Sequence, residues 1–409
     1  MVSSGILLAI VYAAFVSLGL PDGAIGVAWP AMRAELGLPL EALGLVTILA
    51  TAGSAASGFA SGRVLARLGT PLVVAISGLM TGLSLLGFAF APSYLVVVAL
   101  ALPLGFGAGS VDAGLNHYAA ERWSSRHMNW LHASWGLGAA LGPAAITWAI
   151  ASGGGWRLGY LSIAGAQLSL ALVFFATLRL WGEGPSRGRA LKEASGAAAE
   201  ATRAPGDQAE AGDSSPAGGP AAPGGRAIRA ALMLAPLGYF IYAGLEVGLG
   251  AWAASVLKDG RGYPAELAGV IAASYYGSIG LGRVVSGLVA DRVGNRRMVR
   301  LGFGLAAVGL LVFGLDLGPL ASLVGIALAG LGYAPIYPCL MHETPRRFDR
   351  ETTRRVVGRQ VASAYLGGAI LPPLVGLVAG RFGLWAVAPM VGLYLAAMAV
   401  SVAALDART

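Results

Sequence analysis

Three polar side chains stand inside a stretch that is otherwise apolar enough for lipid, "GSVDAGLNHY" from Gly109 to Tyr118. They are an acid, Asp112, an amide, Asn116, and an imidazole, His117. An ionised carboxylate near the centre of a bilayer costs at least about 2.5–3.5 kcal/mol on insertion scales, so it usually faces a water-filled cavity or a partner. A carboxylic acid in such a cavity can load and release a proton. We interpret Asp112 as a proton-carrying group, and a structural buried pair is the alternative.

Asn116 follows Asp112 by four residues, so both side chains share one face of a helix. A second polar stripe comes after a short turn, where Asn129, His132 and Trp135 step by three along the next apolar run. Helices joined by a short turn are usually neighbours in space. We therefore expect both stripes to line one hydrophilic wall that binds a solute.

A further acid, Asp22, lies in the first apolar run between Pro21 and Gly23. It is about 17 residues into the predicted helix, which places it in the outer half of the membrane by the rise per residue. The same carboxylate has two possible uses. It can handle a proton or a solute, or it can cap a backbone loosened by the proline.

The second half of the chain offers an acid and several phenol rings at membrane depth. Glu246 follows Tyr239 and Tyr242 at i, i+3, i+7 spacing on one predicted helix. Other tyrosines of this half that lie deep in predicted spans are Tyr275, Tyr276, Tyr333, Tyr337 and Tyr365. Sugar sites favour such rings because a ring face packs on the apolar side of a pyranose while the hydroxyl bonds its rim. Core packing explains the tyrosines equally well, whereas Glu246 is a stronger candidate for proton coupling and solute binding.

Motifs of soluble catalysis are absent from the sequence. It contains no His-Glu-x-x-His, no Gly-x-Ser-x-Gly and no Walker A pattern, so metalloprotease, hydrolase and ATPase functions lack their residues. A single cysteine, Cys339, excludes an internal disulfide or a thiolate metal cluster. We expect no enzyme activity, no cofactor and no metal. Transport driven by an ion gradient is favoured over transport driven by ATP.

The elements that position these residues follow from composition. The 409 residues are 56% hydrophobic and only 12% charged, against a typical charged fraction of about 25% in soluble domains. This composition indicates an all-α membrane protein, because a spanning helix needs roughly 20 mostly apolar residues. Twelve such runs are predicted, near residues 5–31, 41–64, 70–90, 93–119, 128–151, 155–180, 228–257, 264–289, 297–315, 319–343, 354–380 and 381–405.

The distribution of basic residues predicts the orientation. If both termini are cytoplasmic, most arginines fall in inside loops, and the outside loops hold only Arg33, Arg157, Lys258, Arg261 and Arg381. The first run has no basic region before it and no cleavage site, so it is a retained helix of a multi-pass protein of the cell (inner) membrane. The net charge of +8 is explained by this orientation and by contact with anionic lipid, and requires no nucleic-acid partner.

Two halves of the sequence resemble each other across a segment of different composition. Residues 181–227 are rich in Ala, Gly, Pro and Ser and have no apolar period, so they are predicted to be a flexible cytoplasmic linker. Residues 1–180 and 228–409 would then form two six-helix bundles. A shift of 225 residues pairs Gly37 with Gly262, Gly44 with Gly269, Gly62 with Gly287, Arg67 with Arg292 and Gly69 with Gly294; a shift of 230 pairs Gly138 with Gly368 and Pro143 with Pro373. Parallel repeats of this kind rock about a site held between them.

The loop sequence "GLVADRVGNRR", from Gly287 to Arg297, carries a family resemblance. It resembles the gating motif between the second and third helices of each half in the major facilitator superfamily. The residues that match this motif are Gly62, Arg67 and Gly69 in the first half and Gly287, Asp291, Arg292 and Gly294 in the second. Ala66 stands where family members have an aspartate that caps a helix and helps latch one conformation. The resemblance covers the whole chain and implies a transporter with the twelve-helix fold.

A narrower resemblance comes from "LPDGAIGVAWP", "VDAGLNHYA" and "MNWLHASWGLGA". These segments resemble the fucose–glucose–galactose:proton symporter group, which implies roles in proton or sugar handling for Asp22, Asp112, Asn116 and Asn129. His132 stands where the fucose permease has a glutamine. Trp135 falls where the more distantly related lactose permease has the tryptophan that stacks on its sugar.

Together these observations predict a monomeric secondary transporter that moves a small polar solute, a monosaccharide, with a proton by alternating access. The acids Asp22, Asp112 and Glu246 would carry the proton. The predicted solute-binding residues are Asp22, Asp112, Asn116, Asn129, His132, Trp135, Tyr242, Glu246, Tyr276, Tyr337 and Tyr365. A proton-driven exporter of drugs or metabolites is the main alternative, and a membrane receptor or a lipid transporter is a weaker one.

Overall fold

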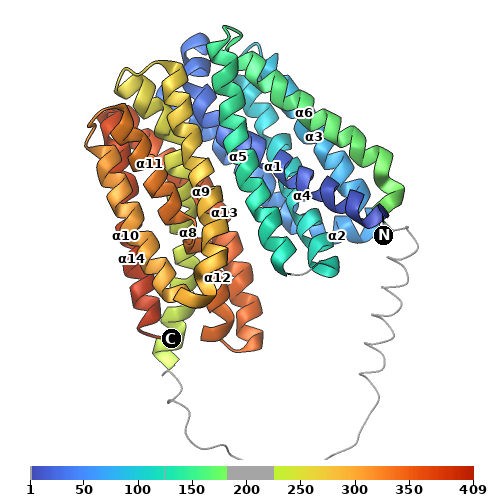
Figure 1. The fold of residues 1–409 in the computed structure, drawn as a ribbon, viewed down its shortest axis with the longest axis vertical. Coiled ribbons are helices and arrows are strands. Elements are labelled where there is room, and N and C mark those ends of the chain that lie inside the picture. The colour runs from blue at the N-terminus through green and yellow to red at the C-terminus, as the bar shows by residue number, and fades with distance from the viewer. Residues whose placement is uncertain (1, 124, 182–224) are drawn as a thin grey trace, which may run out of the picture.

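The computed structural model describes residues 2–123, 125–181 and 225–409, and every regular element in these ranges is helical (Figure 1). The first group of helices, called the N-half here, is α1 (Val2–Leu36), α2 (Leu43–Leu68), α3 (Thr70–Ala89), α4 (Tyr94–Arg122), α5 (Ser125–Ala151) and α6 (Gly155–Thr177), with short turns η1 (Leu40–Ala42) and η2 (Leu178–Trp181). The second group, the C-half, is α8 (Gly225–Ser255), α9 (Ala265–Val293), α10 (Asn295–Gly314), α11 (Pro319–Tyr333), α12 (Ile336–Arg347), α13 (Arg350–Phe382) and α14 (Val387–Asp406), with η3 (Val256–Gly260) and η4 (Leu384–Ala386).

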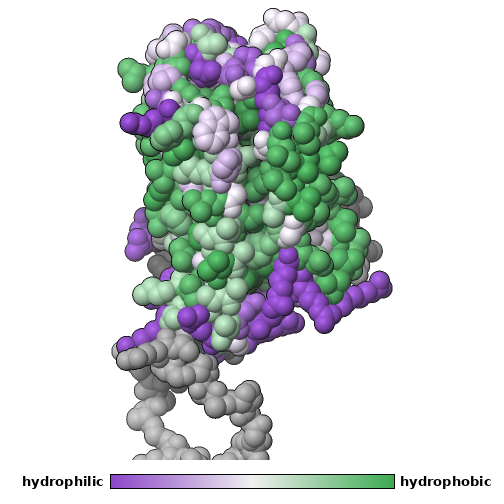
Figure 2. Space-filling view, turned by 90° about the vertical axis from the view of Figure 1, so that its left-hand side faces the viewer, coloured by the Kyte–Doolittle hydropathy of each residue, from purple (hydrophilic) through white to green (hydrophobic). Residues whose placement is uncertain are grey.

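Ten of the described segments are long and apolar enough to cross a membrane. The two remaining long helices, α5 and α9, pack against each other between the halves. Figure 2 shows one face of the molecule, on which a broad apolar band has hydrophilic side chains gathered at its two ends. The chain is therefore an all-α membrane protein with twelve spans, as the sequence predicted.

Two predicted helices differ from the structure. The first continues through Pro30 to Leu36 instead of ending at residue 31, and Asp22 lies just beyond the middle of this longer helix. The predicted helix 319–343 is interrupted between Tyr333 and Ile336. Pro335 lies in this break and has no N–H to donate to the preceding turn, so α12 starts as a new helix.

Most of the predicted linker, residues 182–224, lies outside the described residues. Its two edges are structured. Trp181 is buried and its carbonyl accepts a hydrogen bond from the Tyr118 hydroxyl at 3.2 Å, while Gly225 begins α8. We call the end of the molecule that carries these two edges the linker end.

The internal repeat is visible in the backbone. Gly37 and Gly262 have φ angles of 65° and 71°, and Gly69 and Gly294 have φ angles of 77° and 84°. Each pair is related by the 225-residue shift. Only glycine adopts positive φ at little cost, so the same turn is built at the same place in both halves.

The halves pack together at the end opposite the linker. A Cβ added to Gly44 of α2 would lie 3.0 Å from Pro373 of α13, and one added to Gly269 of α9 would collide with Thr147 of α5. Arg33 on α1 donates to the Asp259 carboxylate on η3 at 2.8 and 3.2 Å, which links the halves by charge. Glycines at these positions therefore permit close approach.

The same helix faces are open at the linker end. Gly58 is fourteen residues after Gly44, close to about four helical turns, and Gly287 is eighteen after Gly269, or about five turns. Each pair therefore shares a face, yet a Cβ at Gly58 or Gly287 would meet nothing within 4 Å. The halves thus diverge towards the linker end, as Figure 1 shows from the side.

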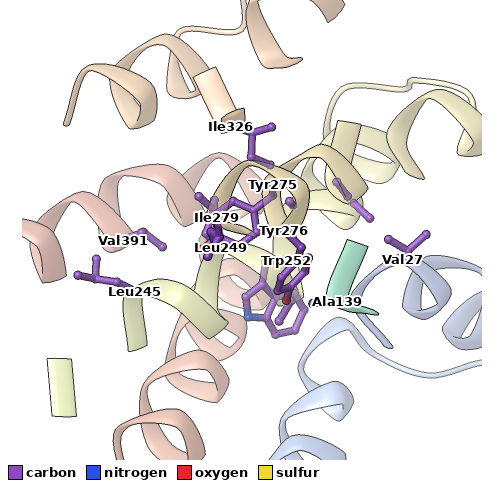
Figure 3. Close-up of a cluster of buried hydrophobic side chains, with 14 of the residues drawn as sticks. Val27, Ala139, Leu245, Leu249, Trp252, Tyr275, Tyr276, Ile279, Ile326 and Val391 are labelled. Atoms are coloured by element: carbon purple, nitrogen blue, oxygen red, sulfur yellow. The ribbon is translucent and has the colours of Figure 1, made fainter. Parts of the chain in front are cut away.

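The core that joins the halves is apolar and aromatic. Figure 3 shows Val27 and Ala139 of the N-half beside Trp252, Tyr275 and Tyr276 of the C-half. All five belong to one buried cluster that extends through both halves. This cluster closes the space between the halves on the side opposite the linker.

The two halves are held differently at the linker end. In the C-half, the buried Glu343 accepts hydrogen bonds from Asn295, Arg296 and Arg346 at 2.9, 3.4 and 2.8 Å. The 225-residue shift pairs Glu343 with Tyr118, whose ring packs against that of Trp181 at 4.9 Å. An ionic cluster in one half thus stands where the other half has an aromatic one.

Candidate functional site

Asp112 and Asn116 lie on α4 and face the space between the halves. The Asn116 side-chain amide donates to the Asp112 carboxylate at 2.8 Å and to its backbone carbonyl at 3.0 Å. Both residues are half-buried. The i, i+4 spacing therefore places both side chains on one helix face, as the sequence predicted. The Asn116 amide is a neutral hydrogen-bond partner for the Asp112 carboxylate.

Asp22 is exposed although it is central in α1. Its carboxylate accepts a hydrogen bond of 2.8 Å from the indole N–H of Trp135 on α5. The helix is unbroken around Pro21 and Gly23. The carboxylate therefore makes a tertiary contact with a site residue, which favours the proton or solute role over a cap.

His132 lies one turn before Trp135 and is also exposed. Its ring meets the Phe15 ring edge-on at 5.6 Å. Asn129 belongs to the same helix, but its side chain lies outside the described residues, as does that of His117. The N-half wall of the site is thus built by Asp22, Asp112, Asn116, His132 and Trp135.

Glu246 on α8 is ion-paired. Both of its carboxylate oxygens accept from Nη2 of Arg283 on α9, at 3.0 and 3.2 Å, and the Tyr275 hydroxyl donates to its backbone carbonyl at 2.8 Å. The side chains of Glu246 and Arg283 are 11% and 19% exposed. Arg283 was not among the residues predicted from the sequence. A lone arginine inside a predicted span costs as much as a lone acid, so the argument applied to Asp112 could have identified it.

The predicted tyrosines divide into two groups. Tyr337 on α12 and Tyr365 on α13 are half-buried. Tyr242 is buried, and its hydroxyl donates to the Tyr333 carbonyl at 3.3 Å. Tyr276 is 7% exposed and lies in the apolar cluster of Figure 3. Tyr337 and Tyr365 can therefore contact a solute directly. Tyr242 and Tyr276 are buried and pack behind the surface of the site.

The two walls meet through Arg283. Its guanidinium lies over the Trp135 ring, 4.9 Å from the ring centre, so the contact crosses from α9 to α5. Asp22 interacts electrostatically with Asp112 and Glu246. Among the described residues the site therefore gathers three acids from two halves around one guanidinium.

Solvent reaches this site from the linker end. Asp22 and His132 are exposed, the cluster of Figure 3 closes the side opposite the linker, and the faces of α2 and α9 are open towards the linker end. The described residues contain no group of three or more His, Cys, Asp or Glu side chains that could hold a metal. The arrangement can bind a polar solute and exchange protons with water.

The gating-motif residues lie around two equivalent turns at the linker end. Gly69 ends α2 and Gly294 ends α9, each with positive φ. Arg67 and Arg292 are exposed in the last turns of these helices. Gly287 faces open space. The surroundings of Gly62 and of the Asp291 side chain lie outside the described residues.

Comparison with known proteins identifies the fold family. The family model described as "Major Facilitator Superfamily" matches residues 11–232 and 234–407, which is nearly the whole chain. The match includes both halves and every site residue named above.

Solved transporters share this fold at low sequence identity. A D-xylose-proton symporter superposes with a TM-score of 0.73 at 15% identity, covering 96% of each chain. A bacterial homologue of the human lysosomal transporter Spinster gives 0.71 at 11% identity, covering 100% of this chain and 97% of that chain. The nucleoside transporter NupG gives 0.71 at 12% identity, covering 97% and 98%. At these identities the likeness shows the fold alone.

Proposed function

Because the chain belongs to the Major Facilitator Superfamily, whose members transport solutes, we propose that it is a proton-coupled symporter of a small polar solute, a monosaccharide. The observation that carries the proposal is the pair of N-half acids, Asp22 and Asp112, which are exposed or half-buried within spanning helices and interact electrostatically with C-half residues. An ionisable group in that position is functional by default. A structural role for Asp22 would bury it.

In the proposed orientation the linker end is cytoplasmic, because the arginine-rich loops lie there. The conformation described above is then open to the cytoplasm and closed to the outside. The membrane is the cell (inner) membrane. One chain supplies both walls of the site, so a monomer is sufficient for transport.

The proposed cycle follows from charge. When the site faces outward, Asp112 and Asp22 take up protons, which removes uncompensated negative charge from the space between the halves. The solute then packs on Trp135 and hydrogen-bonds to the acids and to Asn116, and the halves rock to open the linker end. Solute and protons leave together. Coupling requires that the solute bind the protonated state more tightly than the deprotonated one.

The ion pair with Arg283 gives Glu246 a different role in the proposed cycle from that of Asp112. Protonation of Glu246 would break its ion pair with Arg283 and leave a largely buried guanidinium without a counter-charge. Asp112, whose described side-chain partner is the amide of Asn116, is the better proton carrier. We therefore assign Glu246 to solute binding through Arg283.

The test is sugar uptake into vesicles under an imposed proton gradient. In Asp112→Asn, which keeps size and hydrogen bonding but cannot ionise, gradient-driven accumulation should fall at least tenfold while solute exchange continues. Glu266→Gln is the matched control, because Glu266 is an exposed acid in the first turn of α9. Full gradient-driven accumulation by Asp112→Asn would show that the coupling role is wrong.

A proton-driven exporter of organic cations is a second candidate. The specific observation in its favour is that the Trp135 face already carries a planar cation, the Arg283 guanidinium, beside the acid Glu246. Export predicts that cells expressing the protein tolerate cationic drugs better, and that this tolerance is lost in Asp22→Asn. Sugar-dependent proton entry without such tolerance would eliminate the exporter.

A further inference from the structure

Arg283 occupies the point where the two walls of the site meet. It lies on α9 of the C-half, pairs with Glu246 on α8 and covers the ring of Trp135 on α5. Trp135 in turn donates to Asp22 on α1. A continuous series of contacts, from Glu246 through Arg283 and Trp135 to Asp22, therefore spans the site.

The hydrogen-bonding capacity of Arg283 is only partly used by Glu246. A guanidinium has five N–H donors in a planar fork and no acceptor. Both bonds to Glu246 come from Nη2. The donors on Nε and Nη1 are therefore left for Tyr242, with which Arg283 also interacts, and for a bound molecule.

The opposite wall offers acceptors. The carboxylates of Asp22 and Asp112 accept hydrogen bonds when ionised, and each keeps an acceptor oxygen when protonated. A solute between the walls thus meets donors on one side and acceptors on the other. Hydroxyl groups satisfy both sides because each can donate and accept.

Charged solutes fit this arrangement less well. A carboxylate can only accept, so it would suit Arg283 but would face the negative charge of Glu246, which is paired with the same guanidinium. An ammonium can only donate, so it would suit the two acids but would face the positive charge of Arg283. Like charges placed together in a desolvated site cost several kcal/mol, which makes such mismatches selective.

We propose that Arg283 is a solute-binding residue that restricts the site to neutral polyhydroxylated rings, with Glu246 positioning its guanidinium and Trp135 carrying the solute ring on the indole face that the guanidinium leaves uncovered. The inference rests on the proposed function and names the solute class of the same site. Arg283 contacts hydroxyl oxygens through Nε and Nη1 while Nη2 stays on Glu246. On the opposite wall, Asp22 and Asp112 accept hydrogen bonds from hydroxyl groups at the other edge of the ring.

The test compares three molecules that differ in one group: a hexose selected by a binding screen, its 2-amino analogue and its uronic acid. Wild-type protein in detergent should bind the hexose at least tenfold more tightly than either charged analogue. Arg283→Lys keeps the charge but loses the planar fork, so we expect at least a tenfold higher KM for the hexose, with the rate at saturation within twofold. Arg297→Lys is the control, since Arg297 is exposed in the first turn of α10.

The double variant Glu246→Gln with Arg283→Gln removes both charges together and so leaves no unpaired ion behind. The order of affinities should reverse, with the 2-amino analogue now binding more tightly than the hexose, a change that a purely structural role for Arg283 would not produce. An equal loss for all three molecules, or unchanged hexose binding by Arg283→Lys, would overturn the inference. If wild-type protein binds no member of any such set, the sugar proposal itself fails, which distinguishes the two failures.

Discussion

At the scale of single residues, the site contains acids with different kinds of partner. Asp112 is bonded by the amide of Asn116 and Asp22 by the indole of Trp135, both neutral donors. Glu246 is bonded by the guanidinium of Arg283. Protonating Glu246 would break an ion pair, whereas protonating Asp22 or Asp112 would break none in the described residues. This difference separates proton carriers from a positioning group within one site.

Glu246→Gln should destabilise the protein because it leaves the largely buried Arg283 without its counter-charge. Removing one partner of a buried ion pair costs about 3–5 kcal/mol, which is an upper value here because both side chains keep some exposure. The measurement is thermal unfolding in detergent. The double variant with Arg283→Gln should regain most of the loss. If the double variant is less stable than Glu246→Gln alone, the pair does not act as a unit.

The sequence predicted the chemistry of the site better than its pairing. Asp22, Asp112 and Trp135 were identifiable because an acid or a motif tryptophan in an apolar run is conspicuous. The Trp135–Asp22 bond joins residues 113 positions apart and depends on how α1 packs on α5, which local spacing does not encode. For the same reason Glu246 was expected as an isolated acid, although Arg283 pairs with it.

At the scale of elements, close helix packing depends on small residues. A Cβ added to Gly138 of α5 would collide with the carbonyl oxygen of Val16 on α1. In the C-half, a Cβ at Gly367 of α13, the residue before the repeat counterpart Gly368, would collide in the same way with the carbonyl oxygen of Phe240 on α8. The two helix pairs that flank the site are therefore built by the same device.

Gly138→Ala should destabilise the N-half by about 1–3 kcal/mol, because the added methyl forces α1 and α5 apart. Gly165→Ala on α6 is the control, since a Cβ there meets nothing within 4 Å. Alanine at that position should be neutral or slightly stabilising, because it improves helix propensity. Thermal unfolding of the two variants compares the effects. Equal unfolding temperatures would show that the helices can separate without cost.

Helix existence was predictable from apolar run length, and the glycine turns were predictable from the repeat. Helix ends were less so. The first helix was expected to end at residue 31, yet α1 continues through Pro30 to Leu36, since neighbouring helices can support the backbone that a proline leaves unpaired. Pro335 does interrupt its span. Proline therefore interrupts one predicted helix and not the other, and the packing of neighbouring helices determines which.

At the scale of the whole molecule, the Arg33–Asp259 pair joins the halves at the closed end, while Glu35 pairs with Arg157 inside the N-half. The proposed cycle requires the first pair to separate and leaves the second intact. The Glu35–Arg157 pair is therefore a matched control for the Arg33–Asp259 pair, because Arg33 and Glu35 are only two positions apart on α1.

Cross-linking can test this requirement. In a Cys339→Ala background, which removes the only cysteine, a short bifunctional thiol reagent joining Arg33→Cys to Asp259→Cys should reduce net transport at least tenfold. Joining Glu35→Cys to Arg157→Cys should leave most of it. Transport that survives the first cross-link would show that the closed end does not open during the cycle.

The unlike clusters at the linker end give the two bundles unlike sensitivities to their surroundings. Coulombic contacts such as those around Glu343 are weakened by salt where they are exposed, because mobile ions screen them. The rings of Tyr118 and Trp181 meet edge-to-face, and Arg122 lies over the Tyr118 ring, 3.9 Å from its centre. The apolar part of this association weakens on cooling instead. High ionic strength should therefore weaken mainly the carboxyl-terminal bundle at this end, and low temperature mainly the amino-terminal one. Although the two bundles are repeats of one another, they lose stability under different conditions.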